Sequence, residues 1–456
     1  MSNVGCREQE HMAVLTIEDI VAATGGEILC GDSGYFTGIC IDSRKIQAGE
    51  LFVALKGEHR DGHDFVAQAL DTCSGALVER PVTSPVGDKS IILVRDTLRA
   101  LQDVGHFCRM KNDLPVIAVT GSNGKTTTKE LIASVLGTQY RTLRNTGNLN
   151  NEIGLPLSLT RLTDDDQIIV LEMGASAPGD IRELCTIAAP DYGVLTNISQ
   201  AHLEGFRDMH AIRKTKLELL EAVRVAVVNA DDHFLMEGVR ESGFSGSVLR
   251  YGIKTPADIW ATDIALHERG SSFQIQYADH GFFALKTPLA GVFNIYNILA
   301  AATIGYLFHI EPAQIVNAVE SFAAVPMRME FREVNGITII CDMYNANPAS
   351  MREALRELVR TSKKRSIAVL GDMLELGPQE EQAHRELGTF MAELPVTLFI
   401  AVGPRMEIAA AEFRGRVYHA GSAREAGKLL RETWEAGDTV LIKGSRGMQM
   451  EMVLEA

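Results

Sequence analysis

The first residues that could carry chemistry form a glycine-containing turn between an apolar run and a helical pattern. "PVIAVT" ends at Thr120, "GSNG" follows, and "KTTTKELIASVL" begins at Lys125. Gly124, Lys125 and Thr126 fit the end of the phosphate-loop pattern G-x-x-x-x-G-K-[ST], but Val119 stands where its first glycine should be. Helix N-termini and lysines attract phosphate oxygens, and a threonine hydroxyl can bind Mg²⁺. The stretch therefore predicts a variant loop that holds a nucleoside triphosphate.

Three further polar residues stand where an α/β sheet would present them. Glu172 closes the strand-like run "QIIVLEM", His202 follows "YGVLTNISQA", and Lys216 lies in the helical run "KTKLELL". Ligands of open α/β sheets gather at the carboxyl ends of the strands. Taken singly, each residue also has an ordinary structural interpretation, as a solvated carboxylate, a structural histidine or a charged helix face. Lys214, on the same expected helix, is the other candidate for the functional lysine.

Alternation of strands and helices gives the chain its expected architecture. We predict an α/β fold with three domains, at residues 1–112, 113–325 and 326–456. Residues 113–325 alternate "PVIAVT", "QIIVLEM", "YGVLTNI" and "VAVVNADD" with helical runs, as a doubly wound sheet requires. The alternation starts again after Pro326 with "GITIICD", "RSIAVLGDM", "VTLFIAVG" and "DTVLIKGS". The section before residue 113 mixes shorter strand-like and helical runs.

Composition excludes several classes of protein. Apolar residues make up 46% of the 456 residues, which is normal for a globular chain, and no apolar run approaches the ~18 residues of a membrane span. The charged N-terminus lacks the apolar core of a secretory signal. The net charge of −15 argues against broad nucleic-acid binding. Seven scattered cysteines without a C-x-x-C pair favour a reducing cytosol over a disulfide framework.

The variant loop "TGSNGKTT" resembles that of the Mur ligase superfamily, whose members are ATP-dependent amino-acid and peptide ligases. The other strand-end residues match this superfamily in order and context. The resemblance implies that Thr126 and Glu172 help to hold Mg²⁺ on ATP and that His202 helps to hold a second Mg²⁺. It also implies that Lys216, in preference to Lys214, is carbamylated by CO₂ and becomes an anionic group beside the metals. Lys125, Lys216, Glu172 and His202 are the expected catalytic residues.

The resemblance also implies the rest of the ATP site. "GVFNIYN" matches a superfamily motif in which Phe293 replaces a histidine, and Asn294 is expected nearer the adenine. Arg328 is expected near the phosphates, and Asp342 at the end of "GITIICD" near the ribose hydroxyls. The predicted ATP residues are Gly121, Ser122, Asn123, Gly124, Lys125, Thr126, Thr127, Asn294, Asn297, Arg328 and Asp342.

The two ends of the chain resemble the substrate-binding domains of the muramoyl-peptide ligases. "IDSR", "LFVALKGE" and "RDGHDF" are similar to the uridine-diphosphate-binding domain, so that the first domain is a small α/β UDP-binding domain. The third is a Rossmann-like ligase domain, in which the basic cluster of "LIKGSRG" could meet a carboxylate of the incoming nucleophile. The predicted substrate-binding residues are Ser43, Arg44, Thr146, Asn148, Asn150, Asn151, Tyr344, Asn345, Asn347, Lys443, Ser445 and Arg446.

Three stretches favour one group within the superfamily. "DMYNANP", "LGDMLELG" and "NTGNLNNEIGLP" resemble the ligases that add D-alanyl-D-alanine to UDP-muramoyl-tripeptide, and the D-N-P-R motif typical of diaminopimelate- or lysine-adding ligases is absent. The resemblance implies a bacterial cytoplasmic enzyme, expected as a monomer, that forms an acyl phosphate with ATP and Mg²⁺. The alternative is a ligase that adds a single amino acid, diaminopimelate or lysine, to UDP-muramoyl-dipeptide. A nucleotide-dependent switch would need a guanine-reading N-K-x-D, which we do not find.

Overall fold

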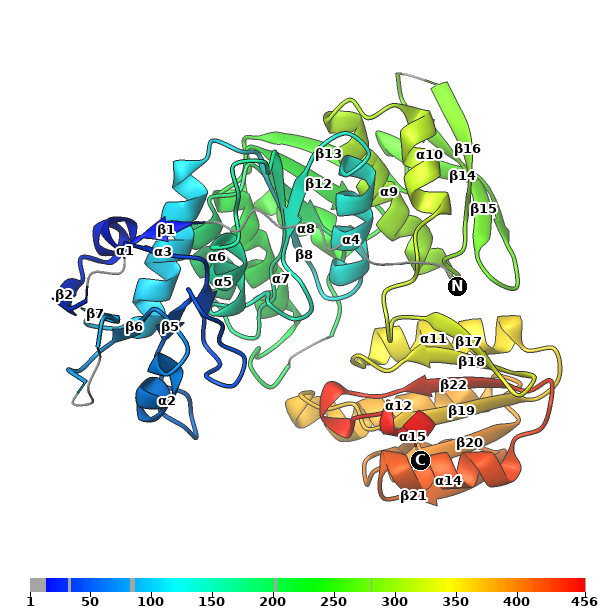
Figure 1. Ribbon diagram of the computed structural model, residues 1–456. Helices are drawn as coiled ribbons and strands as arrows, with labels where there is room; N and C mark the ends of the chain where they lie inside the picture. The colour runs from blue at the N-terminus through cyan, green and yellow to red at the C-terminus, as the bar shows by residue number, and fades with distance from the viewer. Residues whose placement is uncertain (1–13, 32–33, 83–86, 201–202, 280, 456) are drawn as a thin grey trace, which may run out of the picture. The chain divides into compact units, whose positions relative to one another are not determined.

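The computed structural model describes residues 14–31, 34–82, 87–200, 203–279 and 281–455 (Figure 1). Contacts between residues divide the chain into two compact units. The first comprises the residues up to 118 together with 140–174 and 179–192, and the second comprises 119–139, 175–178 and the chain from 193 onward. Strand β8 (Val116–Thr120) crosses from the first unit into the second.

The first unit begins with a mixed sheet whose strand order is β2-β7-β6-β5-β4, and β1 pairs with β3 separately. Strands β4 to β7 pair in parallel, and β2 is antiparallel to β7 at the edge. Helix α1 begins with a capping box between Thr16 and Asp19. The elements are β1 (Leu15–Thr16), α1 (Ile17–Thr24), β2 (Glu27–Cys30), β3 (Tyr35–Phe36), β4 (Ile39–Cys40), β5 (Leu51–Val53), η1 (Gly62–Phe65), α2 (Val66–Leu70), β6 (Gly75–Val78), β7 (Ser90–Leu93) and α3 (Thr97–Lys111).

The remainder of the first unit continues the sheet that contains β8. Strand β9 (Thr142–Arg144) pairs in parallel with β10 (Ile168–Glu172), and the Ile169 N–H donates to the Pro115 C=O just before β8. Helices α5 (Gly154–Leu159) and α6 (Asp180–Ala188) contact α3. Every residue of β10 is buried, as expected of a parallel strand covered on both faces. The strand thus brings Glu172 to its carboxyl end.

The second unit contains a sheet with strand order β16-β15-β14-β13-β12-β11-β8. Strands β12 to β14 pair in parallel, and β15 and β16 extend the sheet in antiparallel. Helix α4 contacts the largely buried helix α9 and also α10 (Figure 1). The elements are α4 (Lys125–Leu136), β11 (Tyr192–Leu195), α7 (Met209–Leu217), η2 (Glu218–Glu221), β12 (Val225–Asn229), α8 (His233–Glu241), β13 (Ser247–Gly252), β14 (Ile259–Leu266), β15 (Ser271–Tyr277), β16 (Gly281–Thr287), α9 (Val292–Leu307) and α10 (Pro312–Glu320).

The C-terminal part of the second unit is a separate sheet, drawn from yellow to red in Figure 1. Its order is β17-β18-β22-β19-β20-β21, parallel except for β17. Apolar residues of α14 and α15 belong to the same core cluster as alternate residues of the central strands. The elements are β17 (Glu330–Val334), β18 (Ile337–Asp342), α11 (Pro348–Thr361), β19 (Ser366–Gly371), η3 (Gly377–Gln379), α12 (Glu380–Ala392), β20 (Leu398–Val402), α13 (Met406–Glu412), β21 (Arg416–Ala420), α14 (Ala423–Thr433), β22 (Thr439–Lys443), η4 (Arg446–Met448) and α15 (Met452–Glu455).

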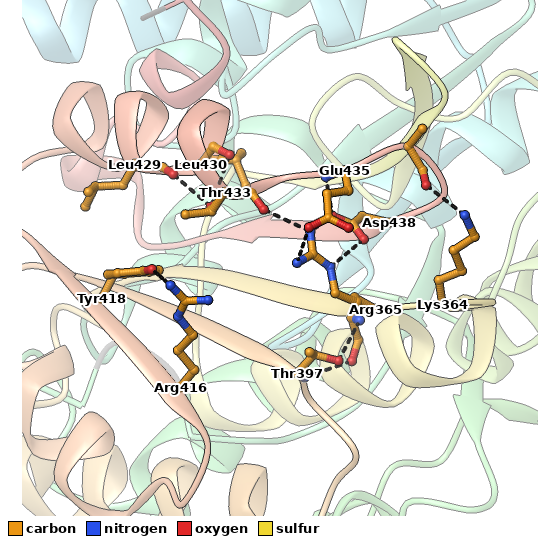
Figure 2. Close-up of polar contacts among 12 residues, drawn as sticks. Lys364, Arg365, Thr397, Arg416, Tyr418, Leu429, Leu430, Thr433, Glu435 and Asp438 are labelled. Carbon is orange, nitrogen blue, oxygen red and sulfur yellow. Dashed lines mark hydrogen bonds and ion pairs between the residues drawn. The ribbon is translucent and has the colours of Figure 1, made fainter.

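An ion-pair cluster lies at the end of this C-terminal sheet where strands β19 and β22 begin (Figure 2). Arg365, directly before β19, donates to both carboxylate oxygens of Asp438, directly before β22, at 2.9 and 2.6 Å. The same guanidinium donates to the Thr433 C=O at 2.8 Å and pairs with Glu435 at 3.1 Å. The Asp438 side chain is only 1% exposed, whereas the Arg365 side chain is 31% exposed, and the two have the bidentate geometry that favours a stable Arg–Asp contact.

The alternation read from the sequence is confirmed as an α/β fold, with some differences in detail. Helix α4 covers the residues that the pattern indicated, 125–136. The helical run "KTKLELL", residues 214–220, is divided between α7 and the 3₁₀ helix η2. Strands β13 to β16 were not predicted, although β15 has the alternating burial of a half-buried strand. In the part of the chain that the structure describes, no helix is both long and apolar enough to cross a bilayer.

Candidate active site

The predicted phosphate loop has a backbone that only glycine fits. Gly121 has φ +142° and Gly124 has φ +81°, both in the region that disfavours other residues. A Cβ at Gly121 would lie 2.0 Å from Thr196 Oγ1, and one at Gly124 would lie 2.5 Å from Asn297 Oδ1. Gly124 is also the N-cap of α4, so the first amides of the helix follow it directly. The loop therefore forms a tight turn, packed against Thr196 and Asn297, at the N-terminus of a twelve-residue helix.

The segment after β11 holds this loop in place. The Ser122 N–H donates to the Asn197 C=O at 2.9 Å, and the Asn123 N–H donates to Asn197 Oδ1 at 3.1 Å. Thr196 Oγ1 donates to the Asn123 C=O at 2.7 Å, and Ser122 Oγ donates to the Ser199 C=O at 2.9 Å. These three residues of the segment were not predicted from the sequence. Their signal was a run of polar residues directly after a buried strand, "TNIS".

Lys125 lies over the loop rather than pointing away from it. Its Nζ donates to the Gly121 C=O at 2.9 Å and to the Ser122 C=O at 3.3 Å. Thr126, the next residue of α4, is 7% exposed, and Thr127 is half-buried. The ammonium, the loop backbone and the helix N-terminus are therefore gathered at one place, an arrangement suited to binding polyphosphate.

Two predicted adenine-site residues lie beside the loop. Asn297 Oδ1 accepts from Thr128 Oγ1 at 3.1 Å, and Asn297 Nδ2 donates to Asn294 Oδ1 at 3.0 Å. Asn294 Nδ2 in turn donates to the Ala290 C=O at 2.7 Å. The contacts join the start of α9 to α4, so the "GVFNIYN" motif is brought to the phosphate loop by the packing of these two helices.

Asp231, which the sequence did not single out, fixes the start of α9 from the other side. Its carboxylate accepts from the N–H groups of Ile253, Lys254 and Thr255 and from the Tyr296 hydroxyl, the last at 2.7 Å. Burial raises the pKa of Asp231, but these hydrogen bonds outweigh it and hold the pKa at about 2. The ionised carboxylate thus ties α9 to the loop after β13.

Glu172 lies in the first unit, at the end of β10, and is 3% exposed. Its Oε1 accepts from Asn150 Nδ2 at 2.7 Å. Its backbone N–H donates to Asn145 Oδ1, and its backbone C=O accepts from Asn145 Nδ2, both at 2.9 Å. Asn145 was not predicted, whereas Asn150 was predicted to bind substrate. Thr146, Asn148 and Asn151, from the same loop, are exposed.

Lys216 and Lys214 differ in burial. Lys216 is 3% exposed on α7, whereas Lys214 is exposed. Helix α7 is capped by Asp208, whose carboxylate accepts from the Ala211 N–H at 2.9 Å. The choice of Lys216 over Lys214 as the functional residue stays a prediction. His202 lies outside the described residues.

Five predicted residues of the C-terminal domain lie near the carboxyl ends of β18 and β22. Lys443 Nζ donates to Asp342 Oδ2 at 2.6 Å and to the Asn345 C=O at 2.9 Å. Asp342 Oδ1 also accepts from the Met329 N–H at 3.2 Å. The guanidinium of Arg328 lies 4.0 Å from the centre of the Tyr344 ring. Lys443 is 2% exposed, and its charge is therefore paired with Asp342 rather than presented to solvent.

The remaining predicted substrate residues have varied surroundings. Ser445 Oγ accepts from the Leu374 N–H at 2.8 Å, and the exposed Arg446 pairs with Glu451 at 2.8 Å. Asn347 caps α11 by accepting from the Ser350 N–H, and its Nδ2 donates to Asn123 Oδ1 at 2.7 Å.

In the N-terminal domain, Arg44 is exposed and forms a bidentate contact with Asp42, at 2.8 Å to each carboxylate oxygen. Hydrogen bonds from Arg44 lower the pKa of Asp42 to about 2. Ser43 lies between them and is half-buried.

The residues present fit a magnesium nucleotide better than a metal held by protein alone. In the described part of the chain, no group of three or more His, Cys, Asp and Glu side chains is arranged to hold a metal ion. Mg²⁺ in nucleotide sites is bound through one or two protein oxygens together with phosphates and waters. In the second unit the hydroxyl of Thr126 supplies one such oxygen, and Lys125 and the loop amides supply N–H groups suited to the phosphates.

Comparison with known proteins connects these observations. Residues 35–78 match the model described as "Mur ligase family, catalytic domain", residues 119–305 the Mur ligase middle domain, and residues 327–446 "Mur ligase, glutamate ligase domain". The chain is 36% identical to UDP-N-acetylmuramoyl-tripeptide–D-alanyl-D-alanine ligase of Bacillus subtilis, over 92% of both chains. It is 32% identical to the enzyme of that name from Escherichia coli, over 98% of both chains.

Solved structures agree with this relationship. MurF from Acinetobacter baumannii superposes with a TM-score of 0.90 at 33% identity, covering 98% of this chain and 99% of that one. MurF ligase from Thermotoga maritima, in complex with ADP, superposes with a TM-score of 0.81 at 31% identity, covering 92% and 96%. Both share the three-domain α/β fold. The chain therefore belongs to the Mur ligase family.

Proposed function

We propose that the chain is an ATP-dependent, ADP-forming ligase that joins D-alanyl-D-alanine to UDP-N-acetylmuramoyl-tripeptide and so makes the pentapeptide precursor of peptidoglycan. The observation that carries the proposal is similarity over almost the whole chain to ligases of that name, at 36% identity in the first case. The glycine loop supports the nucleotide part, because it ends at the N-terminus of α4, where backbone N–H groups and Lys125 can bind phosphate oxygens. The absent D-N-P-R motif favours the dipeptide over a single amino acid.

The reaction has two chemical steps. An oxygen of the tripeptide's terminal carboxylate attacks the γ-phosphorus of ATP, the bond to the bridging oxygen breaks, and ADP leaves. The amine of D-alanyl-D-alanine then attacks the carbonyl carbon of the acyl phosphate, and the tetrahedral intermediate collapses to amide and phosphate as the amine loses a proton. Phosphoryl transfer depends chiefly on positioning and charge. The loop amides and Lys125 hold the phosphates and stabilise the charge that develops on them.

Metal binding is part of the same proposal. Bound Mg²⁺ neutralises charge on the triphosphate and polarises the phosphorus that is attacked. Thr126, Glu172, His202 and a carbamylated Lys216 are the residues proposed to hold two such ions. Carbamylation turns a buried ammonium, which would repel a cation, into an anion that attracts one.

The remaining predicted residues bind the organic substrates. Residues 1–112 bind the UDP group, with Ser43 and Arg44 near the nucleotide sugar, and residues 113–325 bind ATP. Residues 326–456 contribute Arg328 and Asp342 to the ATP site and bind the incoming dipeptide. We propose a monomer that acts on small molecules in the bacterial cytoplasm and needs no nucleic acid.

The proposed function is tested by phosphate release from ATP in the presence of UDP-muramoyl-tripeptide. We expect rapid release with D-alanyl-D-alanine and little with single D- or L-amino acids. A preference for diaminopimelate or lysine, with UDP-muramoyl-dipeptide as acceptor, would instead identify the alternative ligase. ATP turnover that is independent of any amine would refute both.

The carbamate has its own test. Lys216→Ala should be almost inactive, and a short carboxylic acid should restore part of the activity by supplying the missing anion. Lys214→Ala is the matched control on the same helix and should keep most of its activity, because Lys214 is exposed. Wild-type turnover by Lys216→Ala would remove the carbamate from the mechanism.

A further inference from the structure

Two asparagines hold Glu172 through both its backbone and its side chain. Asn145 directly follows β9, which pairs in parallel with β10 through Val170 and Arg144. Its side-chain amide bonds both the N–H and the C=O of Glu172 at 2.9 Å, as a neighbouring strand would. Asn145 is 2% exposed, and its Nδ2 also donates to the Leu149 C=O at 2.7 Å. The side chain therefore extends the pairing of β9 and β10 by one residue and fixes the backbone that carries the carboxylate.

Asn150 fixes the carboxylate itself. Its Nδ2 donates to Glu172 Oε1 at 2.7 Å, and its own backbone C=O accepts from the Gly174 N–H at 2.8 Å. A Cβ at Gly174 would lie only 3.0 Å from Asn150 Oδ1, so this glycine leaves space for the amide. Asn150 is thus held at the end of β10 by two contacts, one with the carboxylate of Glu172 and one with the backbone of Gly174.

The chemistry of an amide suits a carboxylate that must bind a cation. An amide N–H orients a carboxylate oxygen but carries no net charge. Lysine or arginine at the same place would orient the carboxylate and also neutralise it, which would weaken its attraction for Mg²⁺. The hydrogen bonds of metal-binding carboxylates to neighbouring groups commonly set the geometry of the site.

We propose that Asn145 and Asn150 are positioning residues that present Glu172 to Mg²⁺, so that Asn150 acts through this carboxylate rather than by contacting the muramoyl peptide. The inference rests on the proposed function, because it needs Glu172 to be a metal ligand. Asn145 is too buried to replace cleanly, so Asn150 carries the test. Removing an outer hydrogen-bond partner of a metal ligand typically lowers metal affinity about 10- to 100-fold.

The experiment measures binding of a non-hydrolysable ATP analogue to the full-length protein as Mg²⁺ is titrated. Asn150→Ala should raise the Mg²⁺ midpoint at least about 10-fold and leave metal-free affinity for the analogue unchanged. Asn150→Leu keeps the γ-branched shape of the side chain but removes the donor, and it should raise the Mg²⁺ midpoint in the same way if Asn150→Ala folds poorly. Asn112→Ala is the matched asparagine control in the same unit, because its Nδ2 donates to the Cys108 C=O instead, and its midpoint should equal that of wild type.

Glu172→Gln distinguishes the positioning role of Asn150 from the metal-binding role of Glu172. If it raises the midpoint and both Asn150 variants do not, the positioning role is refuted and the proposed metal ligand stands. If Glu172→Gln itself leaves the midpoint unchanged, the metal part of the proposed function fails. Combining Asn150→Ala with Glu172→Gln should raise the midpoint no further than Glu172→Gln alone, whereas additive shifts would show that Asn150 acts independently of Glu172.

Discussion

Replacing Gly124 by alanine should damage the nucleotide loop by an amount that the structure lets us calculate. The new methyl group would lie 2.5 Å from Asn297 Oδ1, so Asn297 must move. Its hydrogen bonds with Thr128 and Asn294 are then lost or weakened, at about 1 kcal/mol each. The positive φ of +81° adds about 1–2 kcal/mol of backbone strain for any residue with a Cβ.

Gly243 provides the matched control. It has φ +65°, but a Cβ there would meet nothing within 4 Å, so Gly243→Ala carries the strain without the collision. Gly124→Ala should therefore cost about 2 kcal/mol more than Gly243→Ala. For a domain of this size the difference corresponds to about 4–8 °C in Tm. ATP-analogue affinity should fall at least about tenfold in Gly124→Ala alone, because only this change displaces the phosphate loop.

Tryptophan fluorescence can follow the relevant domain. The chain has two tryptophans, Trp260 in β14 and Trp434 after α14, so Trp434→Phe makes Trp260 the reporter of the sheet beside the loop. Urea unfolding is then measured in this background for each glycine variant, with and without Asn297→Ala. Because Asn297→Ala removes the atom that the methyl group meets, Gly124→Ala should become no more costly than Gly243→Ala. The collision would be refuted if Gly124→Ala and Gly243→Ala lowered the free energy of unfolding equally while Asn297 is present. It would also be refuted if the effects of Gly124→Ala and Asn297→Ala were strictly additive.

Three further outcomes are expected. Lys125→Ala should abolish phosphate release while Tm and circular dichroism stay unchanged, and normal turnover would contradict the phosphate-loop assignment. Burial lowers the pKa of His384, so that below about pH 6.5 the unfolded chain binds more protons than the folded one, and the free energy of unfolding should decrease as the pH is lowered. His384→Gln should flatten this part of a Tm-against-pH profile, and an unchanged slope would exclude His384 as its source. Arg365→Met should cost about 2–4 kcal/mol by leaving Asp438 buried without its partner, whereas Arg385→Met, from an exposed pair, should leave Tm unchanged within error; equal effects would contradict the burial argument.

Local elements were predictable from sequence where one strong signal dominated. Helix α4 begins where glycine gives way to Lys125, because the glycine turn cannot continue a strand and the following residues suit a helix. Of the unpredicted strands, β15 and β16 were missed because the alternation of strand and helix favoured parallel units throughout, whereas these two pair in antiparallel. The antiparallel extension has period-two burial, as in β15, and that pattern was available in the sequence.

Contacts between distant segments could not be predicted in the same way. Thr196 meets the loop at Gly121 because β11 lies beside β8, and the order of strands in a sheet does not follow from their order in the chain. The same holds for Asn145, which reaches Glu172 only because β9 pairs with β10. Types of residue at strand ends indicated a site, and the resemblance supplied their roles, but the partners that hold them in place required the fold.

Strand β22 has an ion pair at each end, and these two pairs affect how its sheet unfolds. Asp438, immediately before the strand, is paired with Arg365, and Lys443, its last residue, is paired with Asp342. Sliding β22 by one residue against its neighbours would break both ion pairs and turn every core-facing side chain toward the opposite layer. Partial register slips are therefore disfavoured, and β18, β22 and β19 should open together. In native-state hydrogen exchange, we expect their amides to share one opening free energy.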